Sequence, residues 1–298
     1  MTDNALMTIS QEELDAFAAE MGASAEDLSG GGGSFLPAFK VWSEDDDEAE
    51  DAPRLKGKLY LTGQEENVFA DIKTVRFRPL THTFQWRKWD KENQVVSNKT
   101  VLIYSFKEEA QDEKGTVRCG KPPSKELKDN KALQELYKDI TTFRIIQGYV
   151  SYTGKTKEGK TVEVKDVLAS INAKGASFNQ FDEEYIKLLP AKSNLWDFET
   201  GITLSKEKNV SVTYWVMHYV PDFATKKAVT IQVFNDMKEL KSRIEATNKA
   251  IRKKYFDAVN SRSSTDAGMD AINSVVSGRP GKPGLDDFDS LNDDDIPF

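Results

Sequence analysis

The chain has 298 residues, of which 38% are hydrophobic and 30% charged, and its formal net charge at pH 7 is −8. This length allows one large domain or two small ones with a substantial core. No run approaches the roughly 20 apolar residues that cross a bilayer, and residues 1–20 lack the basic-then-apolar order of a secretory signal. One cysteine, Cys119, and two histidines, His82 and His218, are too few for an internal disulfide or a four-coordinate structural zinc site. We therefore expect a cytoplasmic protein with no membrane association, no cofactor and no metal.

The charge is distributed unevenly along the chain. Residues 1–34 hold seven acidic and no basic side chains, Glu44–Asp51 hold seven more acids, and Leu285–Phe298 hold six aspartates and no base. Residues 52–284 carry 40 basic and 29 acidic side chains. The acidic excess thus belongs to terminal or linker-like segments, and the central body is basic enough to attract a polyanion.

The N-terminal segment, residues 1–34, is expected to hold one helix and a tether. Ser10 and Glu13 fit a capping box, and apolar residues then recur at helical spacing, which predicts an amphipathic helix near residues 11–21. Gly30–Gly33 are typical of a flexible tether. The apolar stripe of the helix would pack on the body or, through self-association, on a neighbouring protomer.

The body, residues 35–260, is expected to be a β-rich α+β structure with helical insertions. Segments rich in β-branched and aromatic residues predict strands at 38–42, 55–61, 68–77, 84–89, 95–106, 141–152, 161–167, 210–220 and 228–234. The strand at 210–220 is expected to be central. Helical periodicity predicts helices at 124–138, 182–189 and 236–259.

The last segment, residues 261–298, lacks periodicity and is rich in Ser, Gly, Pro and Asp, which predicts a disordered acidic tail. It ends in Asp293, Asp294, Asp295, Ile296, Pro297 and Phe298. Acidic side chains followed by two apolar anchors and a terminal carboxylate suit a basic pocket with an apolar floor.

This tip resembles the partner-docking tail of bacterial single-stranded DNA-binding proteins. The resemblance covers the last six residues and the linker before them, while the body is longer than in that family and starts with an extra helix, as is common in bacteriophage-encoded binding proteins. It implies a non-catalytic protein that coats and protects single-stranded DNA in replication, recombination and repair, near the nucleoid of a bacterial cell or a phage-infected host.

The resemblance has two further implications. Residues 293–298 would recruit a polymerase, helicase, primase or nuclease, and the body would be an OB-like, partly open antiparallel barrel. Independently of the resemblance, the acidic charge of the tail predicts that it competes with DNA for the basic body. An acidic tail that serves only solubility is the alternative interpretation.

Single strands need cations for their phosphates and flat apolar faces for their bases. Basic and aromatic residues interleave in three clusters of the body. The candidate DNA-binding residues are Arg76 and Arg78; Phe84, Trp86, Arg87, Lys88 and Trp89; and Tyr149, Tyr152, Lys155, Lys157 and Lys160. Taken singly, each aromatic side chain fits the core better than a stacking platform, and the prediction rests on the clustering.

A competing motif is found at Gly154–Thr161, which fits the phosphate-binding pattern G-x-x-x-x-G-K-[ST]. A P-loop needs a helix after Thr161, whereas the sequence there alternates as a strand, so we expect a lysine-rich hairpin tip. A P-loop NTPase using Lys160 and a single-strand annealing protein are the alternative functions.

No other catalytic motif is recognisable, and we do not expect an enzyme. His218 is predicted to be a buried, hydrogen-bonded residue rather than a base or a ligand. Glu183 and Glu184 are predicted to lie on a solvated helix face, and residues 212–220 to be core.

Overall fold

The computed structural model describes residues 36–42, 55–64, 66–108, 110–115, 124–209 and 212–263. Within these ranges the chain forms two compact units. Unit 1 contains residues 36–82 and 144–242, and unit 2 contains residues 83–143 and 243–263. The predicted N-terminal helix, its tether and the docking tip lie outside the described residues.

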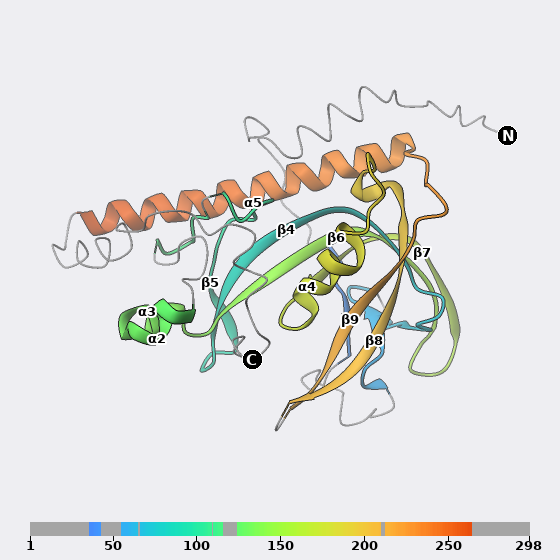
Figure 1. Ribbon diagram of the computed structural model, residues 1–298, viewed down its shortest axis with the longest axis horizontal. Coiled ribbons are helices and arrows are strands. Elements are labelled where there is room, and N and C mark those ends of the chain that lie inside the picture. Colours follow the sequence, from blue (N-terminus) through green and yellow to red (C-terminus); the bar gives the residue numbers. More distant parts are fainter. Residues whose placement is uncertain are drawn as a thin grey trace. The chain divides into compact units, whose positions relative to one another are not determined.

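The strands form an open antiparallel sheet (Figure 1). The described strands are β1 (Phe39–Val41), β2 (Leu59–Leu61), β3 (Phe69–Ala70), β4 (Arg76–Asp90), β5 (Val95–Lys99), β6 (Ile140–Lys155), β7 (Thr161–Ala173), β8 (Glu199–Asn209) and β9 (Val212–Asp222). Their order is β1-β2-β3-β6-β4-β8-β9, with β5 paired to β4 and β7 paired to β6.

Helices are few. They are α2 (Ser124–Asp129), α3 (Lys131–Tyr137), α4 (Ser177–Phe181), the π-helical turn η2 (Asp182–Ile186), the 3₁₀ turn η3 (Leu195–Asp197) and the long α5 (Ile231–Ser263). The β-rich α+β class with helical insertions is therefore confirmed.

Three strand predictions were wrong. The segment 68–77 is not one strand, because a turn at 71–74 separates β3 from β4. Residues 228–234 do not form a strand, because α5 begins at Ile231 and the Thr230 hydroxyl accepts the Val233 N–H. Val233, Met237 and Leu240 then fall on one buried helix face, a spacing that the short apolar run at 228–234 alone did not reveal. The strand predicted at 95–106 ends at Lys99.

The strand β9 is not central but last in the strand order. Its outer edge is covered by the α4–η2 segment. The Ser177 hydroxyl accepts the Met217 N–H at 3.0 Å, and a Glu184 carboxylate oxygen accepts the Tyr219 N–H at 2.7 Å. These contacts satisfy main-chain groups that an edge strand would otherwise expose.

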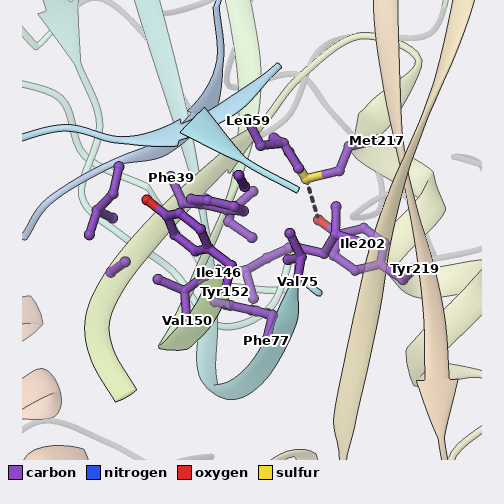
Figure 2. Packing of buried hydrophobic residues seen from close by; sticks show 14 of the residues in the cluster. Phe39, Leu59, Val75, Phe77, Ile146, Val150, Tyr152, Ile202, Met217 and Tyr219 are labelled. Carbon is purple, nitrogen blue, oxygen red and sulfur yellow. Dashed lines mark hydrogen bonds between the residues drawn. The ribbon is translucent and has the colours of Figure 1, made fainter. Parts of the chain in front are cut away.

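The core of unit 1 follows from strand alternation. On β6, Ile146, Val150 and Tyr152 are all buried, and Ile202 of β8 lies opposite Tyr219 of β9 (Figure 2). The Tyr219 hydroxyl also donates to the Met217 sulfur, shown as a dashed line in Figure 2. These residues form the part of the core to which β6, β8 and β9 contribute.

One glycine permits a close approach within this core. A Cβ at Gly148 of β6 would lie only 2.1 Å from the Arg78 carbonyl oxygen of β4. Since no real Cβ tolerates such a contact, the two strands can approach this closely only because residue 148 is glycine.

Unit 2 has its own buried side chains, among them Trp86, Ile103, Ile140, Ile244 and Ile251. Asn248 of α5 connects the helix to the neighbouring loop. Its side-chain oxygen accepts the Leu102 N–H, and its side-chain nitrogen donates to the Leu102 carbonyl, both at 2.7 Å. A single amide thus satisfies both main-chain groups of one loop residue.

Asn248→Ala should lower the free energy of unfolding by about 1–3 kcal/mol, because it leaves the two main-chain groups of Leu102 without partners. Urea denaturation measures this loss. Lys249→Ala, at an exposed position of the same helix, is the control and should change stability by less than about 0.5 kcal/mol. Equal losses in both variants would contradict the structural role of Asn248.

The pH dependence of stability should include a contribution from His82. Burial, and secondarily the nearby Arg144 guanidinium, lower the pKa of His82 from 6.5 to about 3. Between these values the unfolded chain binds a proton that the folded chain does not, so stability falls as the pH drops below 6.5. The loss should approach about 1.4 kcal/mol per pH unit.

Urea denaturation of the wild type and of His82→Gln between about pH 7 and pH 4 measures this contribution. The shared carboxylates affect both proteins alike, so the difference isolates His82. The wild type should lose stability more steeply than the variant. Parallel pH profiles would show that His82 is protonated as easily in the folded state as in the unfolded one.

Candidate nucleic-acid interface

Unit 1 contains an open pocket of about 640 Å³, within the range typical of ligand sites. Its walls come from the turn before β2, from β3 and the turn after it, from the ends of β6 and β7, and from β8 and β9. The apolar lining residues are Leu59, Phe69, Ala70, Ile72, Leu204 and Trp215; the polar ones are Lys58, Asp71, Thr153, Lys155, Thr161 and Thr203; Gly57 and Gly154 contribute backbone.

Trp215 supplies the largest flat surface of this pocket. It is half-buried on β9 and lies opposite Lys206 of β8, whose ammonium is 5.8 Å from the ring centroid. On the same face of the β8–β9 ladder, the pairs Ile202–Tyr219 and Leu204–Met217 belong to the core or pack on it. The prediction that residues 212–220 are core is therefore correct for Val216, Met217 and Tyr219 but wrong for Trp215 and for the exposed Val220.

Lysines surround the pocket. Lys58 and Lys155 line it and are exposed. Nearby, the Lys157 ammonium lies 5.2 Å from the centroid of Trp42, which packs edge-to-face on Phe69, one of the lining residues. Cations and flat apolar rings thus occur together, as a single strand requires.

Lys155 and Lys160 belong to the predicted hairpin tip, which is confirmed. The Thr156 N–H donates to the Lys160 carbonyl at 2.9 Å, and Gly159 has a positive φ of 92° that closes the turn. Strand β7 starts at Thr161, so this segment lacks the strand-to-helix geometry of a P-loop. Lys160 is exposed at the tip.

The other predicted residues of unit 1 contact protein groups, although Arg76 is exposed. The guanidinium of Arg76 donates to the Val75 carbonyl, and that of Arg78 donates to the carbonyls of Trp196 and Ala228. Burial lowers the pKa of Arg78. Tyr149 donates to Asp236, so its hydroxyl connects β6 to α5.

Tyr152 requires a correction, because it is 3% exposed and its hydroxyl donates to the Val68 carbonyl at 2.9 Å. A ring enclosed by the core offers no face for stacking. Phe84 and Trp86 of unit 2 require the same correction, since they are 6% and 1% exposed and both pack on Phe106. Strand alternation identified the side chains on one face correctly, but that face is the core.

Arg87, Lys88 and Trp89 are more accessible. Arg87 and Lys88 are half-buried, and Trp89 is 43% exposed opposite Val96 of β5. The Arg87 guanidinium lies 4.5 Å from the centroid of Phe143. This surface of unit 2 combines basic and aromatic groups.

His218 has an acidic neighbour that the sequence did not reveal. Its Nδ1 is 2.8 Å from a Glu184 oxygen, and its Nε2 is 2.9 Å from the Ser205 hydroxyl. The prediction of a hydrogen-bonded histidine is confirmed, although the side chain is 30% exposed rather than buried. Glu184 is likewise a structural residue rather than a solvated one.

The order acid, histidine, serine is also that of an activated nucleophile. Two contacts argue for a structural role instead. Glu184 is anchored by the Tyr219 N–H, and the Ser205 hydroxyl also lies 3.3 Å from a Glu207 carboxylate oxygen, which competes for its proton. The network ties η2 to the β8–β9 ladder.

Comparisons with protein-family models, curated proteins and solved structures found no match. Among the described helices, none is both long and apolar enough to cross a membrane. Among all the residues that the structure describes, no three His, Cys, Asp or Glu side chains are grouped as a metal site requires. Residues 293–298 lie outside the described part of the chain.

Proposed function

We propose that the protein binds single-stranded DNA without catalysing a reaction, and that the Trp215 pocket of unit 1 is a principal contact site. The observation that carries this proposal is the half-buried indole of Trp215 in a pocket bordered by Lys58 and Lys155. An unpaired base would stack on the indole, and the adjoining phosphates would lie near the lysines. Each stacked base contributes about 1–3 kcal/mol in proteins of this kind.

The open antiparallel sheet supports this proposal because a single strand must reach its site from solvent. An OB-like, partly open barrel is the architecture we propose for the body. The pocket lies where strands from both ends of the strand order meet the β6–β7 hairpin. Binding only the unpaired state would protect exposed strands and melt hairpins by mass action.

The sequence of the tail supports a second part of the proposal. Residues 293–298 would recruit proteins of replication, recombination or repair, such as a polymerase, helicase, primase or nuclease, in a bacterial or phage-infected cell. The acidic residues and the two apolar anchors, Ile296 and Phe298, are the features that a basic, apolar-floored pocket would recognise.

The test is fluorescence anisotropy of a labelled poly-thymidine oligonucleotide and of its duplex counterpart across a salt series. The full chain should prefer the single strand, and its affinity should fall with salt. Trp215→Ala should weaken binding by about tenfold or more, the loss expected for one stacked base. The control is Phe256→Ala, because Phe256 is an aromatic residue of α5 that is 53% exposed outside the pocket.

Equal binding of single and double strands by the wild type would contradict the proposed function. Equal losses in Trp215→Ala and Phe256→Ala would assign binding to another surface. The basic and aromatic surface at Arg87 and Trp89 would then be the next to test.

A further inference from the structure

Gly57 has a backbone conformation that few other residues adopt. Its φ is +76°, and it lies in the turn directly before β2. Main-chain hydrogen bonds hold this turn: the Gly57 N–H donates to the Trp42 carbonyl at 2.9 Å, and the Trp42 N–H donates to the Lys58 carbonyl at 2.8 Å. The position of Gly57 is therefore fixed by backbone contacts rather than by a side chain.

The Cα of Gly57 packs on the indole of Trp215. A Cβ at residue 57 would lie 2.1 Å from Cζ2 of the ring, 2.4 Å from Cε2 and 2.5 Å from Cη2. Nearly equal distances to one ring atom and to both of its bonded neighbours place that Cβ over the face of the ring, not beside its edge. Gly57 thus covers one face of the benzo ring of Trp215.

We propose that Gly57 is a positioning residue for strand binding, and that its bare backbone supports one face of Trp215 so that a single base stacks on the opposite face. This inference rests on the proposed function. It defines the ligand as one unpaired base per indole, since the face against Gly57 is occupied by protein. The same contact excludes a second base from the face of the ring that Gly57 covers.

Supporting the ring before the ligand arrives has an energetic advantage. An aromatic side chain that must be ordered on binding loses rotamer freedom at that moment, and this cost reduces affinity. A ring already held by backbone does not incur it. Two features favour glycine at residue 57: its positive φ, and the position of the indole, which leaves no room for a Cβ.

Gly57→Ala tests the inference, and Gly63→Ala is its matched control. Gly63 has nearly the same φ, +75°, but nothing lies within 4 Å of the position of its Cβ. Both variants carry the same backbone strain, and only Gly57→Ala places a methyl group against the indole. Gly57→Ala should bind poly-thymidine about tenfold more weakly than wild type, as Trp215→Ala does, and Gly63→Ala should bind within about twofold of wild type.

The double variant Gly57→Ala, Trp215→Ala should bind no more weakly than Trp215→Ala alone, because the alanine at 57 acts through the ring. A smaller ring gives a second test that remains available if Gly57→Ala does not fold. Phenylalanine lacks the benzo ring atoms that meet the added methyl group. Trp215→Phe with and without Gly57→Ala should therefore bind with equal affinity.

The outcomes separate the two proposals. If Trp215→Ala weakens binding but Gly57→Ala binds as wild type does, the positioning role is overturned and the proposed function stands. If Gly57→Ala and Gly63→Ala lose affinity equally, backbone strain explains the loss and the positioning role is again overturned. If wild type shows no preference for single strands, the proposed function itself fails.

Discussion

The pairing of β8 with β9 is the interaction on which the site depends. Along one face of this ladder, Ile202, Met217 and Tyr219 lie in the core, Leu204 packs on it, and Trp215, opposite Lys206, lines the pocket. Because cross-strand partners share a face, a shift of register by one residue would move Trp215 to the other side. The core therefore sets the register, and the register places the indole.

Covering the edge of β9 protects this arrangement. Ser177 and Glu184 accept main-chain N–H groups of β9, and Glu184 also contacts His218. Without these partners the strand would offer its edge to other chains. Gly57 packs on one face of the ring, so that both the strand and the indole are positioned by contacts made without ligand.

The basic surplus of the body overstates the charge available to a polyanion. Burial lowers the pKa of Arg78, Arg87 and Arg144, and each of these guanidinium groups is bound by protein. Arg78 donates to carbonyls, Arg87 lies on Phe143, and Arg144 pairs with Asp182. These three arginines are structural, whereas exposed side chains such as Arg76, Lys58, Lys155 and Lys160 carry accessible charge.

Local patterns predicted much of the fold but little of the pocket. Alternation in residues 141–152 and 161–167 located β6 and β7, and the lysine-rich turn between them was expected. Strand β8 was not predicted, because Lys206, Glu207 and Lys208 hide its alternation, and without β8 nothing distinguished Trp215 from a core residue. Gly57 could not be identified either, since its contact with Trp215 joins residues far apart in the sequence and depends on register.

Alternation also misassigned aromatic residues for a physical reason. In the sequence, aromatic residues such as Trp86 and Tyr152 fit a stacking platform as well as a core. Only their burial in the structure shows that they belong to the core. The clusters that were expected around residues 76–89 and 149–160 therefore contain both accessible and buried side chains. Their lysines and Trp89 remain accessible, while their other aromatic rings, apart from the half-buried Tyr149, stabilise the fold.

The most direct measurement is photo-cross-linking of the full chain to a poly-thymidine strand that carries 5-iodouracil, followed by mass spectrometry of the linked peptides. Stacking of one base on the face of Trp215 opposite Gly57 predicts that the dominant cross-link maps to Trp215 and that it is lost in Trp215→Ala. A strand cross-linked efficiently but never to residues that line the pocket would contradict the account.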